Sequence, residues 1–133
     1  MIIADTNVLL RAALNDDPEQ SRNARQALAD AATIAVPLQA VCEFVWVMLR
    51  SYKSRRQAVA SAVLALIADR KVSCDRDAIA AGLAFLLDGG DFADGVIEYE
   101  GRRLGGRTFV TFDRAAATHI RGKGRECTLL NDG

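Results

Sequence analysis

The chain opens with MIIADTNVLLRAAL (residues 1–14), and this stretch decides the fold class. A short apolar run ends at Asp5, and the residues that follow have the apolar spacing of a helix. Asp5 or Thr6 then serves as the N-cap, because either side chain can accept a hydrogen bond from a free amide of the first helical turn. The stretch therefore predicts a buried strand that turns directly into a helix.

The same arrangement recurs near the C-terminus. The β-branched and aromatic run 108–112 is followed at once by Asp113 and the helix-prone RAAATHI. Further short strands are expected at 33–36 and 128–130, and strands that alternate with helices indicate a parallel sheet covered on both faces. Ligands of such sheets bind outside the carboxyl ends of the strands. If the first strand and the 108–112 strand are neighbours, Asp5 and Asp113 lie side by side.

Start and stop signals predict the remaining helices. Each signal is a side chain that can cap the free amides of a first turn, a proline at the first helical position, or glycine after the last turn. The expected signals are Asp17 with Pro18, Pro37, Ser54, Asp75 or Asp77, Gly89-Gly90, Asp91, and Gly105-Gly106.

The composition fits one folded domain over residues 1–133. Half of the residues are hydrophobic, and a chain of this length buries roughly two-thirds of its unfolded surface on folding. Seventeen acidic and seventeen basic residues cancel, so any contact with nucleic acid must be local. Cys42, Cys74 and Cys127 have no CxxC spacing, which fits a reducing cytoplasm. Neither a signal peptide nor a membrane span of roughly 20 apolar residues is expected.

Glu43 is a further candidate for chemistry. It lies in AVCEFVWVML (residues 40–49), where nine of ten residues are apolar. We therefore expect a helix with little polar surface, in which Glu43 is partly buried and Trp46 belongs to the core. A buried carboxylate needs either a metal ion or a salt bridge to an arginine, and both interpretations stay open.

Two more acids occur in DFAD (residues 91–94), at the start of an expected helix. Asp91 suits the N-cap, and Asp94 falls on the first turn. Asp94 either complements the helix dipole or takes part in chemistry. Asp5 and Asp113 have the same alternative, since each can act as an N-cap alone. His119 is the only histidine, so chemistry that needs two histidines is excluded, and we expect it to be solvated.

The four candidates Asp5, Glu43, Asp94 and Asp113 offer only oxygen ligands. Such a set suits a hard cation such as Mg²⁺, for which Mn²⁺ can substitute. A bound cation relieves the repulsion between crowded carboxylates, which otherwise raises their pKa values. Clusters of this kind support attack of a metal-activated water on a phosphodiester.

These motifs together resemble a PIN-domain ribonuclease, specifically the VapC-type toxin of bacterial type II toxin–antitoxin systems. The similarity covers essentially the whole chain. It includes the order, spacing and flanks of four segments: IADTNVL (residues 3–9), Glu43 in its valine-rich helix, DFAD (91–94) and TFDR (111–114). One departure is Gly95, where the family usually has alanine.

The resemblance implies a fold, an activity and partners. It implies a single PIN-like domain with a five-stranded parallel sheet flanked by helices, and Mg²⁺-dependent endonucleolytic cleavage of RNA. It also implies homodimerisation and inhibition by a cognate VapB-type antitoxin. The acidic quartet would be catalytic, and Asp5, Asp94 and Asp113 would serve the metal, with Thr6, Asp91 and Thr111 as supporting residues. Arg114 is our choice for contact with the substrate phosphate.

Two other functions remain open. A catalytically silent PIN-like interaction module would share the fold, although it has no need for Glu43 in an apolar helix. A phosphoacceptor receiver domain has a similar length and clustered aspartates. That domain needs an acidic pair after its first strand and a lysine after its last long strand, whereas Asp5 stands alone and Arg114 follows Asp113.

Overall fold

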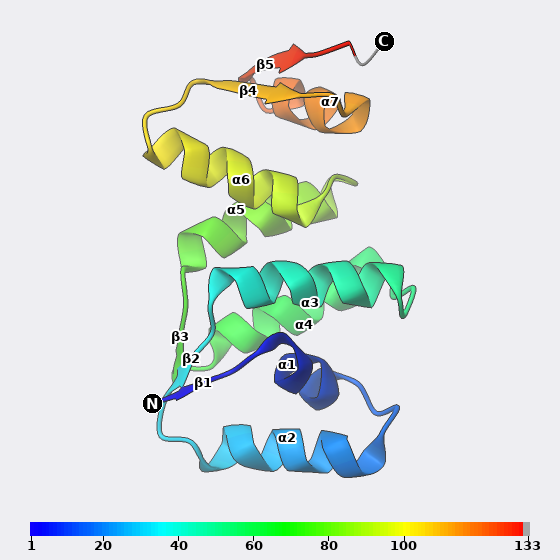
Figure 1. The fold of residues 1–133 in the computed structure, drawn as a ribbon, viewed down its shortest axis with the longest axis vertical. Helices are drawn as coiled ribbons and strands as arrows, with labels where there is room; N and C mark the ends of the chain where they lie inside the picture. The colour runs from blue at the N-terminus through cyan, green and yellow to red at the C-terminus, as the bar shows by residue number, and fades with distance from the viewer. Residues whose placement is uncertain (132–133) are drawn as a thin grey trace. The chain divides into compact units, whose positions relative to one another are not determined.

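A computed structural model describes residues 1–131 of the chain. The described residues form seven α-helices and five β-strands, in an order that alternates strands with helices (Figure 1). The chain divides into two compact units, Met1–Arg76 and a second unit that begins at Asp77.

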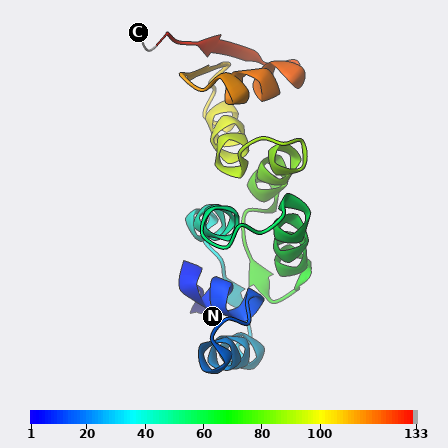
Figure 2. The ribbon, with the colours of Figure 1, turned by 90° about the vertical axis from the view of Figure 1, so that its right-hand side faces the viewer.

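The first unit combines a small parallel sheet with four helices. Its strands are β1 (Ile2–Ile3), β2 (Ile34–Ala35) and β3 (Val72–Ser73), in the order β1-β2-β3. Ile2 lies opposite Ile34, and Ile34 opposite Val72. Its helices are α1 (Thr6–Ala13), α2 (Pro18–Asp30), α3 (Leu38–Arg50) and α4 (Arg56–Ala68). Helix α1 packs against α2 and α3, and α3 packs against α4, which lies beside it in Figures 1 and 2.

The core of the first unit follows from the apolar faces of these helices. Leu9 and Leu10 of α1, and Val59 and Val63 of α4, are buried together with the strand residue Ile34. On α3 the buried positions are Val41, Phe44, Val45 and Met48, which share one face of the helix. Burial of this continuous apolar surface is the main force that holds the helices on the sheet.

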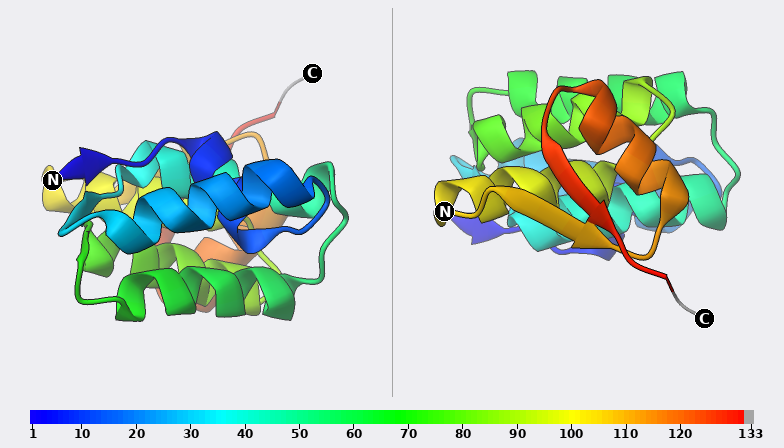
Figure 3. Two further views of the ribbon diagram at one scale, coloured as in Figure 1. Left: turned by 90° about the horizontal axis from the view of Figure 1, so that it is seen from below. Right: turned by 90° about the horizontal axis from the view of Figure 1, so that it is seen from above.

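The second unit begins with helix α5 (Arg76–Leu87), whose first residue, Arg76, still belongs to the first unit. It continues through α6 (Phe92–Arg103), β4 (Thr108–Thr111), α7 (Arg114–Gly122) and β5 (Glu126–Leu129). Strands β4 and β5 pair in parallel, with Thr108 opposite Glu126 and Thr111 opposite Leu129. Both strands pack on α7 (Figure 3, right). The buried residues include Ile79, Phe85, Phe92 and Ile120.

Helices α5 and α6 cross at two glycines. A Cβ atom on Gly95 would lie 2.7 Å from the carbonyl oxygen of Ala81 and 2.8 Å from the ring of Phe85. A Cβ atom on Gly82 would lie 2.7 Å from the ring of Phe92. Gly95 is the departure from the family pattern, and the close approach of the two helices gives the physical reason for it.

The expectation of one five-stranded parallel sheet is wrong for the described residues. The structure has an α/β fold with a three-stranded and a two-stranded sheet. Strand β1 bonds to β2 and strand β4 bonds to β5. The sequence pattern identifies extended apolar segments, but it does not specify which neighbour their backbone groups will bond. The sequence pattern does not predict strand β3.

Most of the expected helix starts are confirmed. Asp17 caps α2 with Pro18 as the next residue, and it accepts a 3.1 Å hydrogen bond from the Gln20 amide. Gly89 has a φ of +88°, a left-handed conformation that glycine adopts after a helix at little cost. The expectation for Ser54 is wrong, since α4 begins one residue later, after Arg55, without a side-chain cap.

Candidate active site

Asp5 lies where the β1 strand ends and α1 begins. The backbone amide of Ala4 donates to the Ala35 carbonyl at 3.0 Å, so the sheet ladder holds the chain up to the residue before Asp5. The Asp5 carboxylate accepts a 3.0 Å hydrogen bond from the Val8 amide. Asp5 is therefore the N-cap of α1, and Thr6 is its first helical residue. The carboxylate is exposed and has oxygen lone pairs left for another ligand.

Thr6 connects this helix start to Glu43 on α3. The Thr6 hydroxyl donates a 2.7 Å hydrogen bond to Oε2 of Glu43. The expectation that Glu43 is partly buried is wrong, because its side chain is exposed. So is the expectation for Trp46, which is 56% exposed. Glu43, Trp46 and Arg50 share the outward face of α3, and the opposite face alone is sufficient to form the core.

Asp5, Thr6 and Glu43 line one end of a groove of about 670 Å³ in the first unit. We call it the α1–α3 groove, since its lining comes from these two helices and the turn after α3. Its other end is lined by Arg11, Ser51 and Tyr52. The structure thus brings together the two acids that the sequence predicted for this part of the chain, which lie 38 positions apart.

The far end of the α1–α3 groove carries a polar network. Nη1 of Arg11 lies 2.9 Å from Oδ2 of Asp16, and the Tyr52 hydroxyl donates to the same oxygen at 2.9 Å. The hydrogen bonds from Tyr52 and from Arg11 lower the pKa of Asp16. This network was not predicted from the sequence. Arg11 and Tyr52 are 41 positions apart, and no spacing rule links residues at that distance.

In the second unit, Asp91 and Asp94 lie at the start of α6. Asp91 is the N-cap and accepts a 2.9 Å hydrogen bond from the Ala93 amide, as expected. Asp94 lies on the first turn and is partly buried. Burial raises the pKa of Asp94 to about 6, and the negative charges of Asp91 and Asp113 add to the effect. The raised pKa means that the protonated form of Asp94 is favoured more than in a solvent-exposed carboxyl group.

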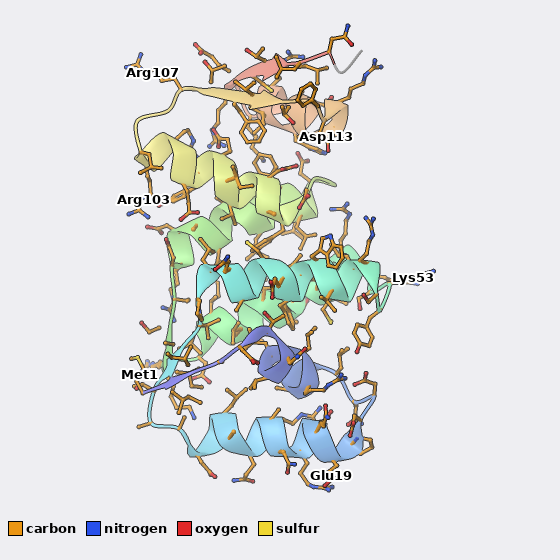
Figure 4. The ribbon with its side chains drawn as sticks, viewed as in Figure 1. Met1, Glu19, Lys53, Arg103, Arg107 and Asp113 are labelled. Carbon is orange, nitrogen blue, oxygen red and sulfur yellow. The ribbon has the colours of Figure 1, made fainter. Side chains whose placement is uncertain are left out.

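Asp113 occupies the start of α7, directly after β4 (Figure 4). It accepts hydrogen bonds from the amides of Ala115 at 2.8 Å and Ala116 at 3.1 Å. Its own amide donates to the Thr111 hydroxyl at 3.0 Å. Thr111 therefore fixes the backbone that carries Asp113. Arg114 is the first residue of α7, and its side chain is exposed beside the cap.

Two further polar side chains in the second unit, Glu98 and His119, have structural partners. Glu98 is only 5% exposed and accepts hydrogen bonds from Arg102 at 2.9 Å and Arg125 at 3.0 Å.

His119 is partly buried rather than solvated, so the expectation that it is solvated is wrong. Its ring lies 3.4 Å from the Asp88 carboxylate and packs against Gly90, just before the start of α6. Both groups stabilise the frame around α6.

Each unit presents acids with supporting polar groups. Within residues 1–131, no group of three or more Asp, Glu, His or Cys side chains lies where it could hold a metal ion. The acids that do lie together offer carboxylate oxygens alone, and Asp94 is held with like charges around it. This donor chemistry fits a hard divalent cation such as Mg²⁺ or Mn²⁺.

No described helix has the length and apolar character required to cross a membrane.

Comparisons with known proteins define the family. Among curated proteins, none matches this sequence. Among solved structures, the chain is similar to the crystal structure of VapC20 from Mycobacterium tuberculosis, described as a sarcin–ricin loop cleaving toxin, with 16% sequence identity and a TM-score of 0.46. That similarity covers 90% of this chain and 95% of the other. The family model of the PIN domain matches residues 2–120, which include Asp5, Glu43, Asp94 and Asp113, and the chain therefore belongs to the PIN domain family.

Proposed function

We propose that this protein is a metal-dependent endoribonuclease built as a single PIN-like domain over residues 1–133. The observation that carries the proposal is that Asp5, Thr6 and Glu43 line one groove, with the Thr6 hydroxyl bound to the Glu43 carboxylate. The crowding of Asp94 with Asp91 and Asp113 supports it. In the proposal Asp5, Glu43, Asp94 and Asp113 serve one reaction.

The metal would be held by Asp5, Asp94 and Asp113. Asp5 and Asp113 each use part of their carboxylate as an N-cap, which fixes the side chain, and each keeps lone pairs for a cation. When bound, Mg²⁺ or Mn²⁺ supplies positive charge for the developing anionic phosphate and lowers the pKa of water. Asp94 would gain most from the cation, because burial of its carboxylate and the nearby negative charges of Asp91 and Asp113 raise its pKa.

The other residues position these groups. Thr6 holds one oxygen of Glu43 and leaves the other available to accept a proton from water. Thr111 fixes the backbone of Asp113. Asp91 fixes the start of α6, and so the direction of Asp94. Arg114, exposed beside Asp113, would contact a phosphate of the substrate, since a guanidinium can bind two phosphate oxygens at once.

The biological setting in this proposal is that of a VapC-type toxin. RNA is the substrate, a cognate VapB-type antitoxin is the inhibitor, the toxin is a homodimer and the location is the cytoplasm. This part rests on the four sequence segments described above, which match such toxins in order and spacing.

The deciding experiment compares cleavage of a single-stranded RNA with Mg²⁺ and with EDTA. Wild type should cleave in Mg²⁺ only. The substitutions Asp5→Asn, Glu43→Gln, Asp94→Asn and Asp113→Asn should each lower the rate by about a hundredfold or more, as expected when a charge that acts on the reacting groups is lost. The matched control is Asp77→Asn, an exposed acid on the first turn of α5. A folded wild type that binds RNA but never cleaves it would instead favour the silent interaction module.

A further inference from the structure

The α1–α3 groove extends well beyond the acids that the proposed function uses. Thr6 and Arg11 both lie on α1, and five residues of helix separate them by about 7.5 Å along the axis. That length is comparable to a single nucleotide. One end of the groove therefore carries Asp5 and Glu43, and the other carries Arg11 and Tyr52 about one nucleotide away.

Tyr52 presents an aromatic ring in a fixed position. Its hydroxyl donates to Asp16 at 2.9 Å and lies 3.4 Å from Nη1 of Arg11. The side chain nevertheless remains 38% exposed. Because the hydroxyl is anchored, the ring loses little freedom when a flat group stacks on it, and nucleic-acid bases stack on aromatic rings without regard to sequence.

The bonds of Arg11 to Asp16 and Tyr52 do not use all of its hydrogen-bond donors. Within residues 1–131, its hydrogen bonds to Asp16 and Tyr52 all come from Nη1. Nε and Nη2 therefore keep donors on the other side of the planar guanidinium. The pairing with Asp16 fixes the guanidinium and balances the charge of the carboxylate next to it. A phosphate is the ligand that fits such a fixed set of donors.

We propose that the Arg11–Tyr52 end of the α1–α3 groove binds one nucleotide of single-stranded RNA next to the bond that is cut. The base stacks on the Tyr52 ring, and a phosphate is bound by Nε and Nη2 of Arg11. This inference rests on the proposed function for the identity of the ligand. The competing interpretation is that Arg11, Asp16 and Tyr52 form only a structural link between the α1–α2 loop and the turn after α3.

Two tyrosine substitutions separate these interpretations. Tyr52→Phe keeps the ring and removes the hydroxyl link, whereas Tyr52→Leu removes both. The proposal predicts that Tyr52→Leu weakens RNA binding about 5- to 100-fold, and that Tyr52→Phe stays within about threefold of wild type. A purely structural link predicts equal effects of the two changes. The measurement is fluorescence anisotropy of a labelled single-stranded RNA of mixed sequence in EDTA, so that no cleavage occurs.

Salt dependence tests the arginine separately. Arg11→Gln should reduce the slope of log K against log salt by about 0.7, because one phosphate contact on a single strand is lost. Tyr52→Leu should leave that slope unchanged. The matched controls are Tyr99→Leu, which changes the only other tyrosine, and Arg22→Gln, which removes an exposed charge from α2. Both should bind as wild type does.

The outcomes distinguish this inference from the proposed function. If wild type cleaves RNA but Tyr52→Leu and Arg11→Gln bind like wild type, the nucleotide subsite is wrong and the nuclease assignment stands. The subsite is also wrong if Tyr52→Phe is as weak as Tyr52→Leu, or if Tyr99→Leu is equally weak. If wild type neither binds nor cleaves RNA, both proposals fail.

Discussion

The hydroxyl group of Thr6 lies 2.7 Å from Oε2 of Glu43 and joins the first turn of α1 to the exposed face of α3. Thr6→Val keeps the shape of the side chain and removes this bond. We expect the free energy of unfolding to fall by about 0.5–1.5 kcal/mol. We expect the RNA cleavage rate to fall by about tenfold, since Glu43 is no longer oriented.

The control for this change is Thr108→Val. Thr108 also donates a 2.7 Å hydrogen bond to a glutamate, Glu126, between strands β4 and β5. Thr108→Val should lower the free energy of unfolding by a similar amount in a urea titration, and it should leave the RNA cleavage rate unchanged. Equal rates for the two variants would remove Thr6 from the supporting residues.

The raised pKa of Asp94 predicts how stability depends on pH. The folded-state pKa is about 6, above the ordinary value of 3.8, so the folded state binds this proton more tightly than the unfolded state. Asp94 contributes its full stabilisation of the folded state below about pH 4, and this contribution is lost as the pH rises through 6. Asp94→Asn is neutral throughout. In EDTA at pH 7.5 it should be more stable than wild type by about 1–2 kcal/mol, after allowance for solvent screening, and the gain should shrink towards pH 4.

Thermal melts with EDTA and with excess Mg²⁺ complete this test. Wild type should gain stability from Mg²⁺ as RT ln(1 + [L]/Kd), which reaches about 2.7 kcal/mol at a hundredfold excess over Kd. Asp94→Asn should gain much less. If Asp94 only complements the helix dipole, the variant instead loses about 0.3–1 kcal/mol and responds to Mg²⁺ as wild type does.

Gly95 should resist substitution despite its place inside a helix. Alanine at Gly95 would bring a Cβ atom to 2.7 Å from the Ala81 carbonyl oxygen, and we expect a net loss of about 1–3 kcal/mol. Gly101 on the same helix has no atom within 4 Å of its position for a Cβ. Gly101→Ala should therefore gain about 0.5–1 kcal/mol from helix propensity. Urea denaturation measures whether each variant lowers or raises the free energy of unfolding. A neutral or stabilising Gly95→Ala would contradict the close helix crossing.

Arg114 should contribute one phosphate contact. Because the net charge of the chain is zero, the salt dependence of RNA binding should be shallow, and Arg114→Ala should reduce the slope by about 0.7. The control is Arg70→Ala, an exposed arginine between α4 and β3. A steep slope that Arg114→Ala leaves unchanged would place the binding surface elsewhere.

The ends of the RNA products report the nucleophile. His119 is the only histidine and is paired with Asp88, so the chain has no pair of histidines that could activate the RNA 2′-hydroxyl. Water should be the nucleophile, which leaves 5′-phosphate and 3′-hydroxyl ends. Mass spectrometry distinguishes these from 2′,3′-cyclic phosphates, whose recovery would show that the RNA attacks itself.

Local features of the chain were predictable from the sequence. The caps at Asp17 and Asp91 are predicted correctly, and Asp5 and Asp113 are possible caps from the sequence, because a cap depends on a side chain and the amides two or three residues later. The family follows for the same reason, since its motifs are contiguous segments.

The burial of single residues and the pairing of strands depended on the tertiary structure. Glu43 and Trp46 were expected inside because their neighbours are apolar, but a helix needs only one face for the core, and Val41, Phe44, Val45 and Met48 already supply it. Backbone groups of a strand can bond to any neighbour, so the sequence could not specify that β1 pairs with β2 and β4 with β5.

The sequence by itself determined the fold class, the family and the identity of the candidate acids, because these depend on residue type and local spacing. Only the tertiary structure decided the bond between Thr6 and Glu43, the Arg11–Asp16–Tyr52 network and the close crossing at Gly95. Each of these joins residues far apart in the chain. Their contact depends on how whole helices pack, which is set by the sum of many apolar contacts and by no single local pattern.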